Sequence, residues 1–314
     1  MLRLLIRRLV MLVPVLFVIS VLVFSLIVLI PGDPAVALAG ETPSPERIAE
    51  VRELMGLDRP LPVQYAEWLK GAVQLDFGRS FYSSQSVWGA ISARLPATLS
   101  LASVTLVFAV FAGLVAGLAA GMRPGGLLDR FATTGASLGV AVPHFWLGLI
   151  LVIVFALQNR WLPAGGYTPL TEDPGAWLRH MILPSLALGA ASAAEIARQA
   201  RASLAGVMQE DYIRTARAKG LAPALVIGKH ALKNAAVPVV TVIGLQASRL
   251  VGGTVVIEQA FALPGIGQLA YQSVFNRDFP MVQGVVVVAA IMVLLLNLLV
   301  DLSYGYFNPK IRQS

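Results

Sequence analysis

Four long apolar stretches without a charged side chain are the feature that most constrains this chain. They cover residues 9–30, 95–122, 131–159 and 279–300. A helix needs about 20 apolar residues to cross the roughly 30 Å of hydrocarbon in a bilayer. Each of the four stretches is long enough to span the membrane with some tilt. The sequence therefore predicts four membrane-spanning helices in these places.

Two shorter apolar runs, residues 181–194 and 234–248, are candidates for further spans. The first reaches full length only if its helix continues past Glu195 and Arg198, and the second only if its helix continues past Arg249. With both runs included, the prediction is an all-α polytopic membrane protein with six transmembrane helices. An even number of spans places both termini on one side of the membrane.

The composition agrees with this fold class. Only 13% of the residues are charged and 57% are hydrophobic, whereas soluble domains have about 25% charged residues. The net charge of +7 could indicate nucleic acid, but the basic residues lie mostly beside apolar runs, where they orient a protein in membrane lipid. No cysteine is present, which excludes disulfides and thiolate chemistry, and the three histidines are too far apart to suggest a metal site.

The positions of the basic residues predict which loops are cytoplasmic. Clusters of Lys and Arg alternate with the spans, as positive charges on the cytoplasmic side do. The clusters are Arg3, Arg7 and Arg8; Arg123 and Arg130; Arg201, Arg214, Arg217, Lys219, Lys229 and Lys233; and Lys310 and Arg312. Both termini of this multi-pass membrane protein are therefore predicted to be cytoplasmic.

The chain divides into two predicted parts. Residues 1–94 hold the first span and an outer helical segment, and residues 95–314 hold a five-helix core with a cytoplasmic loop at 208–236. In the outer segment, Ser44 is placed to cap a helix that has Pro45 at its first position and Gly56 just past its end. A second short helix is predicted to start near Pro62.

Three glycines, Gly113, Gly117 and Gly121, recur every four residues in the second predicted span. This spacing places them on one helix face, where small side chains let another helix approach closely in lipid. The pattern predicts helix packing rather than chemistry.

The loop at 208–236 contains a predicted short helix. Glu210 and Asp211 come at its start, Lys219 comes at its end and Gly220 follows, so charge and terminator both suit a capped helix. Tyr212, Thr215, Ala216 and Lys219 would share one face. Such a face could dock into a groove of another protein, or the segment could be a basic loop that only fixes orientation.

The residues of this loop resemble a known family. The segment Asp211-Tyr212-Ile213-Arg214-Thr215-Ala216-Arg217-Ala218-Lys219-Gly220-Leu221 is similar to the ATPase-docking loop of ABC importer permeases of the dipeptide, oligopeptide and nickel branch. Matching motifs span nearly the whole chain: Pro31-Gly32-Asp33-Pro34, Gly56-Leu57-Asp58-Arg59-Pro60, Leu75-Asp76-Phe77-Gly78-Arg79-Ser80, His230-Ala231-Leu232-Lys233-Asn234, Leu263-Pro264-Gly265-Ile266-Gly267 and Arg277-Asp278-Phe279-Pro280. In the wider family this loop carries Glu-Ala-Ala, three residues, then Gly. Here only Ala216 and Gly220 match strictly, and the longer interval to Pro238 is typical of the peptide and nickel branch.

This resemblance implies a type I ABC importer permease fold and a set of partners. A second homologous permease would complete the pathway, two cytoplasmic ATPase subunits would bind ATP and Mg, and an external solute-binding protein would deliver peptides or, alternatively, nickel chelates or other small solutes. No cofactor would bind to this chain itself, because Gly228-Lys229 lacks the remaining residues of a phosphate-binding loop. The residues implied in ATPase coupling are Asp211, Tyr212, Arg214, Thr215, Ala216, Lys219 and Gly220.

Ionisable and amide residues within the spans are candidates for the translocation pathway. They are Glu195, Arg198, Gln246, Arg249 and Glu258. Glu195 and Arg198 are three residues apart and could equally form an ion pair on their own helix. Arg249 could meet a carboxylate of the solute or pair with a carboxylate of the partner permease, and both possibilities stay open at this point.

Two further classes deserve a test. Residues Gly135-Ala136-Ser137-Leu138-Gly139 fit the G-x-S-x-G string of hydrolases, with His144 nearby. That motif needs a strand-to-helix elbow that exposes the serine, whereas this one lies in a helical apolar run. A stand-alone secondary transporter is the other class, and the lack of visible repeated halves argues against it.

Overall fold

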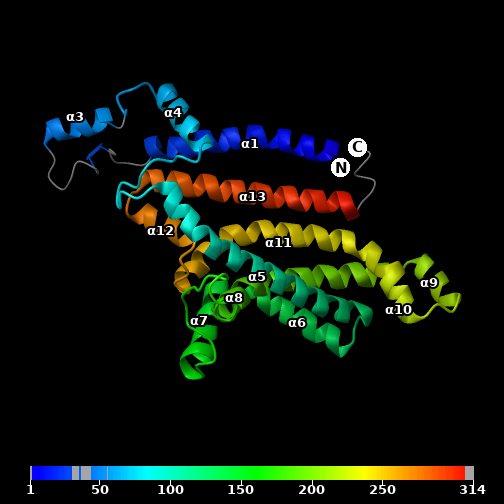
Figure 1. Cartoon of the computed structure of the whole chain (residues 1–314). Helices are drawn as coiled ribbons and strands as arrows, with labels where there is room; N and C mark the ends of the chain where they lie inside the picture. Colours follow the sequence, from blue (N-terminus) through cyan, green and yellow to red (C-terminus); the bar gives the residue numbers. More distant parts are fainter. Residues whose placement is uncertain (1, 30–34, 37–43, 55, 308–314) are drawn as a thin grey trace.

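The computed structural model describes residues 2–29, 35–36, 44–54 and 56–307. Throughout this part the secondary structure is helical, with a single isolated β-bridge between Arg79 and Ser86. The long helices run side by side as a bundle (Figure 1). The Pro31–Pro34 motif and the basic residues Lys310 and Arg312 lie outside the described residues.

Five helices of the described part are long and apolar enough to cross a membrane. They are Ile6–Ser25 within α1 (Leu2–Leu29), α5 (Val87–Met122), α8 (Pro174–Val207), Pro223–Leu250, which runs into α11 (Leu232–Ala260), and Phe279–Val300 within α13 (Phe279–Phe307). The predictions that the two weaker runs continue as helix are confirmed, because α8 passes Glu195 and Arg198, and α11 passes Arg249.

The predicted span at 131–159 is the one that the structure corrects. It consists of α6 (Leu127–Ala141) followed by α7 (His144–Leu151) and a π-helical turn, η1 (Val152–Gln158), and the two parts are bent by 103°. Proline disfavours helical backbone in the residue before it, and Val142 before Pro143 is indeed extended, with ψ 123°. Among the described residues, a sixth span is present only if this bent pair is counted as one.

Short helices occupy the two ends of the bundle (Figure 1). At one end, which we call the α12 end, lie α3 (Pro45–Leu54), α4 (Leu61–Val73) and α12 (Ile266–Phe275). At the other, the α9 end, lie α9 (Asp211–Ala218), α10 (Pro223–Leu225) and the π-helical η2 (Val226–Ala231). Helix α1 begins and α13 ends at the α9 end.

The helices predicted for the outer segment are confirmed. The backbone N–H of Arg47 donates to Ser44 Oγ over 3.2 Å, which caps α3 as its sequence predicts. Gly56 follows the helix with φ +65°, a left-handed backbone that glycine adopts readily. Helix α4 begins at Leu61, one residue before the predicted start near Pro62.

The predicted glycine face packs α5 against α8. A Cβ added to Gly113 would lie 2.7 Å from Cβ of Ile196, and one added to Gly117 would lie 2.7 Å from Cβ of Ala200. Real Cβ atoms do not approach that closely, so these positions require glycine for the helices to meet. The packing role predicted from the spacing is confirmed.

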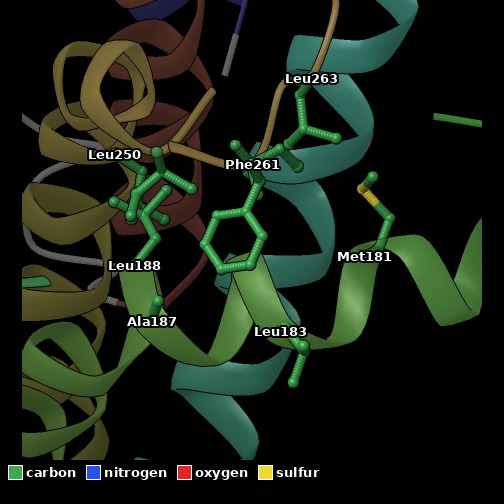
Figure 2. Close-up of a cluster of buried hydrophobic side chains, with 9 residues drawn as sticks. Met181, Leu183, Ala187, Leu188, Leu250, Phe261 and Leu263 are labelled. Carbon is green, nitrogen blue, oxygen red and sulfur yellow. The ribbon is translucent and has the colours of Figure 1, made fainter. Parts of the chain in front are cut away.

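A buried apolar cluster joins α5, α8 and α11 toward the α12 end (Figure 2). Phe261, just after α11, lies in its centre between Leu188 on one side and Leu263 on the other. Gly166 donates its backbone N–H to the Phe261 carbonyl over 3.0 Å, which holds the loop after η1 onto the cluster. The cluster therefore fixes the α12 end of α11.

Helix α1 lies at the edge of the bundle, against α13 and α4. The Ser20 and Tyr65 hydroxyls are 2.7 Å apart and hydrogen-bonded, and the Tyr65 ring packs edge-on against Phe24. The exposed surface of α1 is apolar, with Val13 and Leu22 more than 60% exposed. Such a surface suits lipid.

Candidate functional site

Helix α9 is held to the end of the bundle by two side chains on one face. Ile213 and Ala216, three residues apart, are buried at 0% and 8% exposure. They pack in a cluster with Leu204 at the end of α8 and with Val226 and Ala231 of η2. The same face of α9 is thus used to fix its position relative to α8 and α11.

Both ends of α9 are formed as the sequence predicts. Glu210 stands at the N-cap position and Asp211 in the first turn, where a negative charge favours the helix dipole. Gly220 has φ +75° and donates its backbone N–H to the Arg217 carbonyl over 2.9 Å. This left-handed residue ends the helix, and glycine takes that conformation without the penalty that a Cβ brings.

The remaining coupling residues at α9 are exposed. Asp211, Tyr212, Arg214, Thr215 and Lys219 are exposed, as is Gly220. The Tyr212 hydroxyl accepts a hydrogen bond of 2.8 Å from Asn234 Nδ2, which links the exposed face to α11.

The predicted common face of Tyr212, Thr215, Ala216 and Lys219 is divided in the structure. Ala216 belongs to the buried cluster, so it lies behind the exposed surface and not on it. The sequence did contain an indication that Ala216 is buried. Ile213 is the one strongly apolar side chain of the helix, and Ala216 follows it by three residues, on the same face. The other coupling residues are exposed, and their docking role stays a prediction.

An ion pair between α6 and α8 was not predicted from the sequence. Asp129, buried at the start of α6, receives Nε and Nη2 of Arg201 on its two carboxylate oxygens, the Nη2 contact measuring 2.8 Å. The backbone N–H of Gly125 also donates to Asp129 Oδ2 over 2.8 Å. This pair ties the α5–α6 turn to the part of α8 that leads into α9.

The pathway candidates separate into paired and unpaired groups. Glu195 and Arg198 form the predicted intrahelical ion pair, with Oε1 and Nη2 2.9 Å apart. Gln246 is buried and accepts a hydrogen bond of 3.1 Å from Ser192 Oγ, joining α11 to α8. Arg249 is exposed on α11, and within the described part of the chain no carboxylate forms an ion pair with it.

Glu258 is fully buried at the α12 end of α11. Its Oε1 accepts from Thr98 Oγ1 over 2.7 Å, and its Oε2 accepts from the backbone N–H of Gln268 over 2.9 Å. Thr98 Oγ1 in turn accepts from the backbone N–H of Ile266 over 2.8 Å. The carboxylate therefore joins α5, α11 and α12, and it does not line an open passage in this conformation.

The glycines of the Leu263-to-Gly267 motif make room for this carboxylate. A Cβ added to Gly267 would lie 2.9 Å from Glu258 Oε2 and 2.7 Å from Cα of Val255, and one added to Gly265 would collide with the carboxyl group. Glycine at these two positions thus lets the loop close over Glu258.

Two other motifs of the α12 end meet each other. Ser80 and the backbone N–H of Phe81, after α4, both donate to the buried carboxylate of Asp278, before α13. The Phe81 contact measures 3.0 Å. Segments that are about 200 residues apart in sequence are therefore fixed together by one side chain.

Ser137 of the G-x-S-x-G string lies inside α6. Its hydroxyl donates to the backbone carbonyl of Thr133 over 3.0 Å, a common bond within a helix. His144 begins α7 beyond the Pro143 bend. The strand-to-helix elbow that a serine hydrolase requires is not formed around Ser137.

Comparison with protein families gives two matches that together cover nearly the whole chain. A model described as "Binding-protein-dependent transport system inner membrane component" matches residues 109–313. A second, described as "Binding-prot-dependent transport system membrane comp, N-term", matches residues 1–102.

Curated relatives and solved structures agree with these matches. The chain is 42% identical over 306 residues to a probable peptide ABC transporter permease protein of Sinorhizobium fredii, covering 98% of each chain. It is 43% identical over 312 residues to the glutathione transport system permease protein of Escherichia coli, covering 99% of each. A chain of the MetNI methionine ABC transporter in an inward-facing conformation has a similar fold, with a TM-score of 0.55 at 20% identity over 69% of this chain and 95% of that one. A chain of an amino acid ABC transporter gives a TM-score of 0.53 at 18% identity, covering 69% and 94%.

Proposed function

Because this chain belongs to the family of binding-protein-dependent transport system inner membrane components, we propose that it forms half of the translocation pathway of an ATP-driven peptide importer. It is a multi-pass membrane protein of the transport machinery and not an enzyme. Its family works with an ATPase and a binding protein. Hydrolysis of ATP with Mg takes place on the partner ATPase subunits in this proposal.

The observation that supports this function best is the form of α9. A short helix stands at one end of the bundle, anchored by Ile213 and Ala216 and capped by Gly220. Its outer face presents an aromatic ring, a small polar side chain and charges to the surroundings. A rigidly held amphipathic helix of this kind fits the helix-in-groove mode of docking, and the groove proposed here belongs to an ATPase.

The proposal places the α9 end in the cytoplasm, together with both chain termini. A second permease, identical to this chain or different, completes the pathway, and one ATPase docks beneath each permease. The binding protein docks at the α12 end, where Ser80 and Asp278 hold the loops in place. Peptide is the proposed solute because close relatives are named as peptide and glutathione permeases.

Reconstitution tests this function directly. The complete importer in proteoliposomes should accumulate labelled trialanine only when ATP and the binding protein are both present. A metal chelate instead of a peptide on the purified binding protein would contradict the peptide assignment. Accumulation by the permease alone without ATP would instead support a secondary transporter.

The docking role of α9 predicts the effect of a bulky side chain on its exposed face. Thr215→Trp should lower the amount of ATPase that co-purifies by roughly tenfold or more, because the ring would prevent close contact in the groove. Thr215 is the suitable position, since a tryptophan at Ala216 would disturb the buried cluster instead. The chain should still insert and fold.

The matched control is Ala66→Trp, an exposed position on α4 at the opposite end of the bundle. This variant should retain wild-type levels of ATPase in the same purification. If Thr215→Trp retained them as well, α9 would not be the docking site.

A further inference from the structure

The α12 half of α11 is divided into a covered and an uncovered face. Side chains at Gln246, Ala247, Leu250 and Ile257 are buried. Four residues spaced 4, 3 and 4 apart stay exposed, and we call them the Arg249 stripe: Leu245, Arg249, Gly252 and Val256. This spacing places them along one side of the helix.

The other sides of α11 are in contact with the rest of this chain. Gln246 is hydrogen-bonded to Ser192 of α8. Ser248 donates to Asn297 of α13, on the opposite side. Between the two, Leu250 packs in the apolar cluster with α8. The Arg249 stripe is therefore a side of this helix segment that the described part of the chain leaves open.

Lipid does not suit this open side. The exposed surface of α1 shows what suits lipid. It carries a run of large apolar side chains, including Val10, Val13 and Leu22. Arg249 carries a permanent charge, and charged side chains in spans face water or an opposite charge. It lies eleven residues before the end of α11 at Ala260, which is about 16 Å at 1.5 Å per residue, and it falls within the candidate span Pro223–Leu250.

Three carboxylates of the described helices, Asp129, Glu195 and Glu258, already have other partners. Asp129 is paired with Arg201 and Glu195 with Arg198. Glu258, nine residues beyond Arg249 on the same helix, has both oxygens hydrogen-bonded to Thr98 and Gln268 and is closed off from solvent. A second copy of this chain would bring the same three engaged carboxylates, which favours an anion from the solute as the partner of Arg249.

We propose that Arg249 binds a carboxylate of the solute during translocation, so that the permease itself favours peptides with a free carboxylate. The inference rests on the proposed function, since it requires the Arg249 stripe to line the pathway of an importer. Gly252, one turn further on the same side, leaves space next to the guanidinium. The fork of N–H groups on the Arg249 guanidinium matches a carboxylate in geometry and charge.

The test compares trialanine with trialanine amide, which lacks the free carboxylate. Both are given to the complete importer in proteoliposomes at saturating binding protein, and ATP-driven uptake is measured for wild type, Arg249→Gln, Arg249→Lys and Leu245→Gln. Because the binding protein is the same throughout, a change in the ratio of the two uptake rates between variants reports on the permease alone.

Wild type should take up the acid faster than the amide. Arg249→Gln should lower uptake of the acid by roughly tenfold, as expected for loss of a charge-assisted hydrogen bond, and leave uptake of the amide unchanged. Arg249→Lys should keep most of the preference, and Leu245→Gln, on the same stripe, should keep all of it.

Three outcomes would overturn the proposal. Equal loss of both uptake rates in Arg249→Gln would mean that Arg249 does not distinguish the carboxylate. Loss of the intact complex on size-exclusion chromatography would mean that Arg249 pairs with the second permease. An absence of ATP-driven uptake of both peptides by wild type would overturn the proposed function itself, and this inference with it.

Discussion

Replacing Gly117 with leucine is expected to separate α5 from α8 and to destabilise the bundle by about 3 kcal/mol or more, because the new side chain has no space. Even a Cβ at this position would lie 2.7 Å from Cβ of Ala200 and 2.9 Å from Cα of Ala197. A backbone cannot move aside as the end of a flexible side chain can. Unfolding of the purified protein in detergent micelles measures the loss.

Gly135→Leu provides the matched control. Gly135 also lies in an apolar helix, α6, but a Cβ there would meet nothing within 4 Å, and the residue is exposed. Leucine has a better helix propensity than glycine, so this variant should be as stable as wild type in the same detergent. Equal stability of the two leucine variants would show that the α5–α8 contact does not depend on the small side chain.

The glycine face illustrates what a local pattern can predict. Gly113, Gly117 and Gly121 recur with the period of a helix, so their common side follows from sequence spacing alone. The caps of α3 and α9 could be predicted for the same reason, because Ser44 and Gly220 act on backbone groups within a few residues. Features of this kind need no knowledge of which helix lies next to which.

The break in the third apolar stretch was predictable only in part. Pro143 marks the place where the helix is disturbed, but the 103° bend between α6 and α7 depends on what each part packs against. Gly148 of α7 lies against the ring of Phe261, and Gly139 of α6 lies against α8 at Ala190. Both contacts join segments that are distant in sequence, so the direction of the bend could not be predicted.

The polar residues of the spans show more clearly that contacts between distant segments cannot be predicted from sequence spacing. Arg198 forms an ion pair with Glu195 on its own helix, as their spacing predicts. Arg201 pairs with Asp129, 72 positions away, and its place among the basic residues only indicated orientation. Glu258 was a pathway candidate because a lone carboxylate in a span indicates function, whereas its actual partners come from α5 and α12.

Glu258 gives the second prediction with a large effect. Glu258→Ala should lower the free energy of unfolding by roughly 2–4 kcal/mol, because it leaves the Gln268 N–H and the Thr98 hydroxyl buried without their acceptor. Glu258→Gln should fall between this variant and wild type, since its amide keeps one acceptor oxygen but directs an NH₂ group at a donor. The loss should be seen in the same micelle experiment.

The contrasting variant is Glu195→Ala, which removes a carboxylate from an ion pair whose side chains are 36% and 45% exposed. Exposed pairs contribute at most about 1 kcal/mol, so this variant should be close to wild type although it also deletes a glutamate from a span. Limited proteolysis can then locate the damage. In Glu258→Ala, cleavage should increase in the loop that carries Gly265 and Gly267, because the carboxylate no longer holds α12 against α5. If the two alanine variants unfolded alike and were cleaved alike, Glu258 would not be the residue that fixes the α12 end of the bundle.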